Sequence, residues 1–404
     1  MDISEIWEQL AWNQGGKIVY VILDGLGGLR DPHRGKTELQ AARKPNLDEI
    51  AERSSCGLLE IVGPGITPGS GPGHLTLFGY HPLKYRIGRG ILSALGIDFP
   101  LQPGDVAARV NFATLDGDRQ ITDRRAGRIA TDLNRKLCRK IRENVRLDFE
   151  GEYFFETVSE HRAVLVLRGT GLSADLEDTD PQNTRMAPLD PQAKSAEAHV
   201  TAKLVRSFVE SVERVLADER PANGILLRGF DRYQPLPSLY DRFKLRGVGV
   251  ADYPMYRGVS RLLGMDVVAP PGGLKERFRV LENCYGDDYD FYFLHVKKTD
   301  REGEDGDFDG KVRFIEEVDL LLPHVMALEP DVLVITADHS TPAAMGRHSW
   351  HPVPVALLSR YIRTDDVFLF DEYACAGGSL GRRPGLDLMG LALANAGRLR
   401  KFGA

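Results

Sequence analysis

The feature of this sequence that most limits its fold is a set of short, strongly apolar segments that each run into an acidic side chain. Lys17–Leu23 (KIVYVIL) ends at Asp24, and Asp331–Thr336 (DVLVIT) ends shortly before Asp338. Short apolar runs rich in β-branched residues are typical of strands that are buried on both faces in a parallel sheet. Because open α/β sheets bind ligands at the carboxyl ends of their strands, these segments also predict the place of the chemistry.

Further segments extend the α/β pattern. Tyr289–Val296, Pro352–Ser359 and Gly57–Val62 are predicted strands, and Pro45–Ser54 is a predicted helix. Between residues 312 and 325 apolar side chains recur at three- and four-residue spacing, which predicts one amphipathic helix. Strands that alternate with helices in this way predict a fold with a mostly parallel sheet.

The middle of the chain has a different character, which predicts a second domain. A chain of 404 residues is too long for one ordinary core. From about residue 104 to residue 221 it is richer in charge and in short strand-like pieces such as DVAARVNFAT and HRAVLVLRG. We therefore expect a core domain formed by 1–103 and 222–404, with a smaller domain, 104–221, inserted into it.

Composition limits the classes of partner. The formal net charge of −6 argues against sequence-independent nucleic-acid binding, which requires a basic face, but a local arginine cluster could still bind a small anion. The N-terminal segment does not resemble a signal peptide, and no apolar run approaches the roughly 20 residues of a membrane helix. We expect a cytoplasmic protein that binds neither nucleic acid nor membrane, with four reduced cysteines. No segment indicates an oligomeric state.

Acidic and imidazole side chains gather at the ends of the predicted strands. A single Asp in such a place is usually a helix cap or a turn residue. Several of them, brought to one edge by a parallel sheet, predict a metal site instead, and mixed carboxylate and imidazole ligands suit Mn, Mg, Zn or Co. The set consists of Asp24, Asp300, Glu304, Asp338, His339, His348 and His351.

Ser70 lies in a segment rich in glycine and proline. Gly69, Gly71 and Gly73 would let its hydroxyl lie exposed on a tight turn, and the predicted helix His74–Tyr80 follows at once. A flexible loop is the commoner meaning of such a composition. A metal ion could activate this serine as a nucleophile, so its meaning depends on the predicted ligands.

The motifs ILDG, PGSGPGHL, HVKKTDREGEDGDF, TADHS and RHSWHPVPV occur in this order. Together they resemble the alkaline phosphatase superfamily and, within it, the archaeal-type cofactor-independent phosphoglycerate mutases, over nearly the whole chain. The resemblance implies an alkaline-phosphatase-like α/β fold, with a mostly parallel sheet sandwiched by helices and an inserted smaller α+β domain. It also implies the glycolytic interconversion of 2-phosphoglycerate and 3-phosphoglycerate, without 2,3-bisphosphoglycerate, through a phosphorylated Ser70.

The resemblance implies two metal ions, with Mn expected and Mg, Co or Zn as alternatives. Their ligands would be Asp24, Ser70, Asp338 and His339 at one site, and Asp300, Glu304 and His348 at the other. Many relatives have histidine in place of Glu304, and a carboxylate there favours Mn or Mg over Zn. The spacing to the following proline-rich strand selects His348 rather than His351. His295 could substitute as a ligand, but we interpret it as a packed strand residue.

Two groups of basic residues are candidates for contact with an anionic substrate. Lys297 or Lys298, beside the predicted ligands, could neutralise phosphate charge, with a solvated surface lysine as the alternative. The segment ITDRRAGRIA resembles the family's substrate-binding segment, although a solvated charged surface is the usual meaning of such a run. The candidates for binding a small phosphorylated acid are Asp123, Arg124, Arg125 and Arg128, followed by Arg162, Arg228 and the weaker Arg89.

Other activities fit the same predicted ligands. A phosphomonoesterase, a phosphopentomutase-like enzyme and a homoserine kinase-like enzyme remain alternatives, and so does a protein that binds metal or phosphate without catalysis. The predicted inserted domain favours a mutase over a phosphatase, because a phosphatase does not need to retain its dephosphorylated product.

Overall fold

The structure is a computed structural model that describes residues 3–403. The chain divides into two compact units. The core unit contains the described residues up to Arg86, the segment Pro237–Tyr253 and the chain from Leu263 onward. The second unit contains Ile87–Leu236 and Pro254–Leu262.

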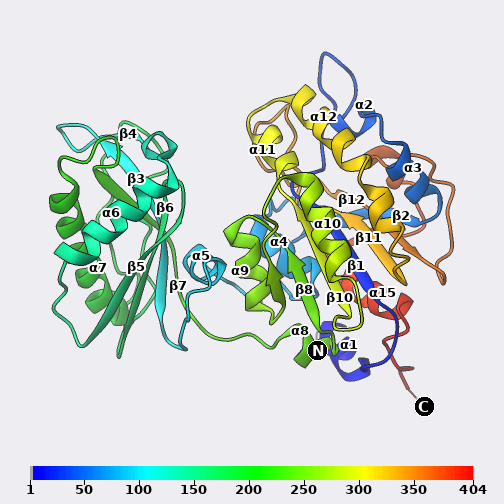
Figure 1. Ribbon diagram of the computed structural model, residues 1–404, viewed down its shortest axis with the longest axis horizontal. Helices are drawn as coiled ribbons and strands as arrows, with labels where there is room; N and C mark the ends of the chain where they lie inside the picture. Colours follow the sequence, from blue (N-terminus) through cyan, green and yellow to red (C-terminus); the bar gives the residue numbers. More distant parts are fainter. Residues whose placement is uncertain (1–2, 404) are drawn as a thin grey trace. The chain divides into compact units, whose positions relative to one another are not determined.

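The core unit is built on an eight-stranded, mostly parallel sheet (Figure 1). Its central strand β1 pairs in parallel with β10 on one side and with β11 on the other. Only β12 runs against its two neighbours, β11 and β2. In spatial order the strands are β13 (Gly381–Pro384), β2 (Ser55–Glu60), β12 (Val353–Ser359), β11 (Val332–Thr336), β1 (Ile18–Leu23), β10 (Phe291–Val296), β8 (Gly247–Val250) and β9 (Asp266–Val268).

Helices cover both faces of this sheet. Alternate side chains of β10 point to opposite faces. On one face Phe293 contacts Phe78 at the end of α4, with ring centroids 5.0 Å apart, and on the other Tyr292 contacts Tyr285 at the end of α10, at 4.8 Å. The helices of this unit are α1 (Ile3–Leu10), α2 (Glu38–Ala41), α3 (Pro45–Glu52), α4 (Ser70–Leu77), α8 (Leu239–Phe243), α10 (Leu274–Cys284), α11 (Lys298–Glu304), α12 (Phe308–Asp319), α13 (Leu322–Met326), α14 (Glu372–Cys375) and α15 (Asp387–Asn395).

The second unit is an antiparallel sheet with helices on its faces. Helices α6 (Thr131–Asn144) and α7 (His199–Leu216) share one apolar core with the sheet, while α5 (Arg89–Gly96) packs so closely on β3 that a Cβ on Gly90 would lie 2.2 Å from the Ala107 oxygen. Helix α9 (Pro254–Leu262) packs on α5. The strands are β3 (Val106–Leu115), β4 (Ile121–Asp123), β5 (Gly151–Ser159), β6 (Arg162–Gly169) and β7 (Gly224–Arg232).

The structure confirms the predicted α/β class, with a mostly parallel sheet between helices and a smaller α+β part. The second unit is longer than the predicted insert of 104–221, since α5 packs on β3 and β7 pairs with β3. Whether 104–221 folds as a domain of its own, between 1–103 and 222–404, stays a prediction. No helix within residues 3–403 combines the length and the apolarity needed to span a membrane.

Two local predictions were wrong. The amphipathic stretch between residues 312 and 325 forms two helices, α12 and α13, with a break before Pro323, a residue that favours the first turn of a new helix. The helix predicted to begin at His74 begins at Ser70 instead. Pro72 is compatible with this earlier start because it lies in the first turn, where its missing N–H has no partner to lose.

The central strands should dominate the stability of the core unit. Ile335 in β11 is fully buried. We expect Ile335→Ala to lower the free energy of unfolding by about 2–5 kcal/mol, because it removes buried surface and leaves a cavity. Ile3, which is 46% exposed, offers a matched control, and Ile3→Ala should change stability by less than about 0.5 kcal/mol. Chemical denaturation followed by circular dichroism measures both, and equal effects would contradict this assignment of the core.

Candidate active site

The carboxyl ends of β1 and β11 bring together one group of possible metal ligands. Asp24 follows β1 directly, and Asp338 and His339 follow β11; all three side chains are fully buried. The Nε2 atom of His339 lies 3.2 Å from Asp24 Oδ1 and 3.3 Å from Asp338 Oδ2. A parallel sheet aligns the ends of its strands, which explains why residues so far apart in sequence meet here.

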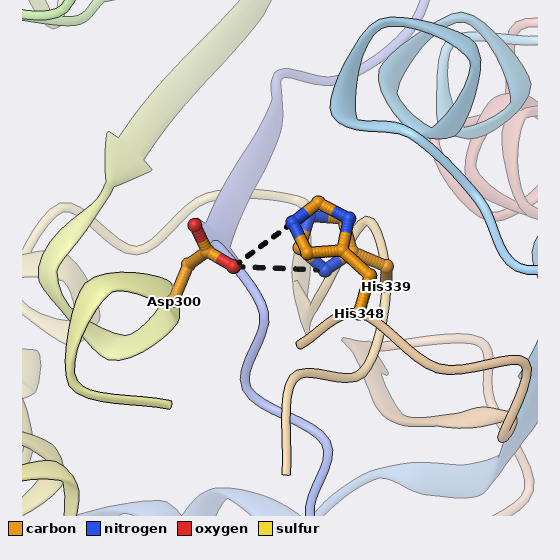
Figure 2. A group of neighbouring side chains, drawn as sticks. All are labelled: Asp300, His339 and His348. Carbon is orange, nitrogen blue, oxygen red and sulfur yellow. Dashed lines mark ion pairs between the residues drawn. The ribbon is translucent and has the colours of Figure 1, made fainter. Parts of the chain in front are cut away.

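A second group lies beside the first and shares His339 with it. Figure 2 shows Asp300, in the first turn of α11, facing His339 and His348. Asp300 Oδ1 lies 3.3 Å from His348 Nε2 and 4.0 Å from His339 Nδ1, and the two imidazole rings are stacked with centroids 3.7 Å apart. The Nδ1 of His348 lies 3.1 Å from the Pro68 oxygen, which leaves Nε2 to face Asp300.

Ser70 lies against the first group. It is the first residue of α4, its side chain is nearly buried, and its Oγ lies 3.2 Å from His339 Nε2. Helix α4 can approach the Asp338 backbone so closely because Gly73 has no side chain. A Cβ atom at this position would lie 2.5 Å from the Asp338 oxygen. The open N–H groups of the first helical turn suit a phosphoryl group next to Ser70.

Lys297 lies between the two groups, whereas Lys298 does not. The Nζ of Lys297 is 3.2 Å from Asp24 Oδ2 and 2.5 Å from Asp300 Oδ2. The Nζ of Lys298 instead lies 3.9 Å from Glu302 Oε1, and this side chain is half exposed. Of the two lysines named from sequence, Lys297 therefore has the geometry to meet phosphate charge.

The electrostatics of the site suit cations. Burial by itself raises the pKa of Asp24, but the Lys297 charge and hydrogen bonds from His295 and His339 outweigh it and hold the pKa well below its usual range. Burial and the Asp24 charge also raise the pKa of Asp300, yet His348, Lys297 and His339 hold it below its usual range. Ionised carboxylates with one lysine between them leave excess negative charge in a buried place, and together with imidazoles they form a donor set that fits divalent metal ions.

Three other residues named from sequence lie beside these groups. Glu304 Oε1 is 3.7 Å from His348 Nε2, and the Glu304 side chain is 51% exposed. His295, buried on β10, has its Nε2 3.2 Å from Asp24 Oδ2 and so lies next to the first group rather than near Glu304. His351 contacts Ser349 Oγ at 3.0 Å and stacks on Trp350.

The second unit holds the predicted arginine segment in a tight turn. The Asp123 carboxylate accepts hydrogen bonds from the N–H groups of Arg125, at 2.7 Å, and Gly127, at 2.6 Å. Ala126, Gly127 and Arg128 all have positive φ, of 45°, 63° and 53°. This conformation is costly for Ala126 and Arg128, which lack the freedom of glycine, so the carboxylate offsets a strained backbone.

Three of the predicted arginines are already paired with carboxylates, and one of them, Arg162, has its Nη1 3.2 Å from Glu160 Oε2. Arg124 makes a forked contact to Asp180, at 2.9 and 2.6 Å. Arg228 lies 3.5 Å from Asp178 and 3.7 Å from Asp180. These contacts fix Arg124 and Arg228 within the unit. Arg89 is the first residue of α5.

Other cations gather around a buried histidine. Burial and the positive charges of Arg162, Arg125, Arg109 and Arg128 lower the pKa of His161 to about 3. The structure thus places three of the predicted arginines around one imidazole and adds Arg109 and His161, which sequence reasoning missed. Neither belongs to the DRRAGR segment, and Arg109 carries only the weak signal of a charge within an apolar strand.

Residues that support the core site were also missed. The Thr341 hydroxyl donates to Asp300 Oδ1 at 2.7 Å and lies 3.0 Å from His339 Nδ1, so it joins the two groups. His74 Nδ1 lies 2.8 Å from the Ser70 oxygen and 3.3 Å from Asp338 Oδ2. A threonine shortly after a strand and a histidine inside a helix carry no pattern that would single them out.

The charge of His348 should make the metal-free protein sensitive to alkaline pH. Burial lowers the pKa of His348, but the hydrogen bond and charge of Asp300 outweigh it and raise the pKa to about 9. The folded protein holds this proton more tightly than the unfolded chain does. Protonated His348 therefore contributes fully to the free energy of unfolding below about pH 6.5, and this contribution is lost as the pH rises through about 9. In chelator, chemical denaturation at a series of pH values measures the free energy of unfolding of both proteins. Over this pH range we expect the wild type to lose up to about 3 kcal/mol more of this free energy than His348→Gln. If the free energies of unfolding of the two proteins depend on pH in the same way, the raised pKa of His348 is contradicted.

Comparisons with known proteins show the family of this chain. The family model described as 2,3-bisphosphoglycerate-independent phosphoglycerate mutase matches residues 51–223. A Thermus thermophilus relative named "Probable 2,3-bisphosphoglycerate-independent phosphoglycerate mutase" is 47% identical over the full length of both chains, and a Thermotoga maritima relative of the same name is 45% identical, also over both full lengths.

Solved structures extend the likeness to the fold. A Pyrococcus horikoshii protein is 29% identical, with a TM-score of 0.83 over 96% of this chain and 100% of that one. The cofactor-independent phosphoglycerate mutase of Thermoplasma acidophilum is 30% identical, with a TM-score of 0.67 over 94% and 100%. With this identity over the full length of its relatives, the chain belongs to the 2,3-bisphosphoglycerate-independent phosphoglycerate mutase family.

Proposed function

We propose that this protein interconverts 2-phosphoglycerate and 3-phosphoglycerate through a phosphorylated Ser70, with two divalent metal ions and without 2,3-bisphosphoglycerate. The observation that carries the proposal is the position of Ser70. Its Oγ lies at the start of a helix and 3.2 Å from the imidazole that both candidate ligand groups share. The role in glycolysis and gluconeogenesis that this activity implies favours a cytoplasmic location.

We assign the metal ligands to two sets. Asp24, Ser70, Asp338 and His339 would hold one ion, and Asp300, Glu304 and His348 the other. Such ions would favour the ionised form of the Ser70 hydroxyl and offset the charge of a phosphoryl group. The three buried aspartates make the site rich in hard oxygen ligands, which supports Mn, with Mg, Co and Zn as alternatives.

The reaction then follows from the protein's own groups. The Ser70 hydroxyl loses its proton as its oxygen attacks phosphorus and the Oγ–P bond forms. The bond from phosphorus to the glycerate oxygen breaks, and that oxygen takes up a proton and becomes a free hydroxyl. The other hydroxyl of the same glycerate then loses its proton and attacks the phosphorus of phosphoserine, so that a new O–P bond forms. The Oγ–P bond breaks, and Oγ takes up a proton and restores Ser70. Lys297 and the N–H groups at the start of α4 would hold the phosphoryl oxygens.

The cationic group of the second unit would bind the phosphorylated acid. Guanidinium groups present forked donors that match carboxylate and phosphate oxygens. Asp123 holds the turn, and Arg124 and Arg228 both contact the buried Asp180. We therefore assign the direct contacts to Arg125, Arg128 and Arg162, of which Arg162 pairs with the half-exposed Glu160. The ion pairs of Arg124 and Arg228 with Asp178 and Asp180 would then stabilise the conformation of this part of the unit.

The first experiment supplies 3-phosphoglycerate and Mn²⁺ without 2,3-bisphosphoglycerate and follows the products by phosphorus NMR. We expect 2-phosphoglycerate without free phosphate, no turnover in excess chelator, and a loss of roughly 1,000-fold or more in Ser70→Ala. Ser207→Ala, at an exposed serine of α7, should match wild type. Free phosphate as the sole product would show a phosphatase instead, and wild-type turnover by Ser70→Ala would rule out the covalent route.

A second experiment tests the substrate contacts. Arg125 is exposed, so Arg125→Ala should leave thermal stability nearly unchanged while it removes a charged donor to the substrate. We expect kcat/KM to fall by about 10- to 100-fold, in line with the loss of about 1.5–3 kcal/mol for a hydrogen bond to a charged group. Arg135→Ala, at an exposed arginine of α6 in the same unit, is the control and should be neutral. An unchanged kcat/KM in Arg125→Ala would refute this assignment.

A further inference from the structure

A fully buried lysine lies behind the candidate active site, and the proposed reaction does not use it. Lys311, in α12, is 0% exposed. Its Nζ donates to the main-chain oxygens of Gly25 at 2.9 Å, Gly27 at 3.2 Å and Thr341 at 2.9 Å. Lysine is almost never fully buried unless it is paired, so this position needs an explanation.

Two carboxylates accompany this lysine. Glu38 Oε1 lies 3.9 Å from the Lys311 Nζ and accepts a hydrogen bond from the Ala343 N–H at 2.7 Å. Glu372 accepts hydrogen bonds from the Gly28 N–H at 2.7 Å and the Thr37 hydroxyl at 2.8 Å. We call Lys311, Glu38 and Glu372 the Lys311 cluster.

The Lys311 cluster bonds to the two loops that carry the candidate ligands. One loop, 24–28, begins with Asp24, and the other, 338–343, begins with Asp338 and His339. The loops also bond directly to each other, since the Thr341 N–H lies 3.2 Å from the Gly25 oxygen and 3.0 Å from the Gly27 oxygen. The three hydrogen bonds that Lys311 donates to Gly25, Gly27 and Thr341 all go to main-chain oxygens of these loops, so the lysine acts on the backbone that carries the candidate ligands.

If the fold required only packing at the position of Lys311, an apolar side chain would fill the space at a lower cost in free energy than a buried charge. Taking a cation and two carboxylates out of water is costly, and well-packed apolar residues often stabilise a core as well or better. What an apolar side chain cannot do is bind three carbonyl oxygens from two separate loops at once. The Lys311 cluster therefore sets the separation and the direction of the loops.

We propose that Lys311, supported by Glu38 and Glu372, is a positioning residue that holds Asp24, His339 and Thr341 in the geometry required for metal binding. The proposal rests on the proposed two-metal function of the site. It assigns a role in that function to the Lys311 cluster, whose members are not proposed to contact the metal, the substrate or the reacting atoms.

The test compares Lys311→Met with Lys275→Met, a matched change at an exposed lysine of α10. The metal-free proteins are titrated with Mn²⁺ in a calorimeter without substrate, and thermal unfolding is recorded for each. We expect Lys311→Met to bind Mn²⁺ about 10- to 100-fold more weakly, with lower kcat and an unchanged KM for 3-phosphoglycerate, since partners that orient ligands have effects of this size. Lys275→Met should match wild type.

A purely structural role for Lys311 predicts a different result, namely a lower unfolding temperature of the metal-free protein with wild-type Mn²⁺ affinity. That result would overturn the proposal. If Lys311→Met does not fold, Glu38→Gln decides, because glutamine still accepts from the Ala343 N–H but carries no charge next to Lys311. Weaker Mn²⁺ binding by Glu38→Gln would support the proposal, and unchanged binding would overturn it.

The proposed function and this inference fail separately. A wild-type protein that binds Mn²⁺ but forms no 2-phosphoglycerate would contradict the mutase, and the Mn²⁺ affinities of the variants would still decide the role of Lys311.

Discussion

The mutual repulsion of buried carboxylates is the constraint on which the rest of the core unit depends. Asp24, Asp300 and Asp338 lie within a few ångströms of the same imidazole, with almost no exposure to water. Anionic groups so close together in a low dielectric repel each other strongly, so the fold must either neutralise them or hold them rigidly against this force. The structure does both, which explains why so much polar structure surrounds one edge of the sheet.

Neutralisation and rigidity come from different groups. Lys297 places positive charge between Asp24 and Asp300, and His348 pairs with Asp300. Rigidity comes from hydrogen bonds that are directed at the backbone, among them the Thr299 hydroxyl to the Asp24 oxygen at 2.5 Å. These two cationic groups lie beside three carboxylates. Buried carboxylates and imidazoles gathered in this way suit the divalent cations that we propose for this site.

The sequence was informative wherever one short segment carried both a structure and a function. Apolar runs predicted β1, β10 and β11, and the acid or imidazole after each run predicted the residues that meet at the sheet edge. It was uninformative where a role depends on two loops that meet only in the fold. Thr341, His74 and Lys311 have ordinary surroundings in sequence, and nothing local distinguishes a lysine buried under carbonyl oxygens from one on a helix surface.

The contacts of the arginines in the second unit could not be predicted for the same reason, because they join segments that meet only in the fold. DRRAGR identifies a cationic turn, but the sequence does not show that Arg124 meets Asp180, more than fifty residues later, or that Arg109 on β3 approaches His161. The contact of Arg124 with Asp180 depends on how two loops meet in the fold, and the approach of Arg109 to His161 depends on strand register, which is set by the whole sheet. Boundaries failed for a related reason, since the start of α4 at Ser70 depends on packing against the Asp338 backbone more than on the helix propensity of SGPG.

The two units solve one physical problem with opposite signs. In the core unit an anionic site stands on loops whose carbonyl oxygens converge on a buried cation, Lys311. In the second unit a cationic group stands on a turn whose N–H groups converge on a carboxylate, Asp123. A turn or loop that gathers like charges would be pushed open by them, and a bond from the opposite charge to the backbone resists this without neutralising the side chains. In both units, then, hydrogen bonds to the backbone from a group of opposite charge support the segment that carries the charged side chains.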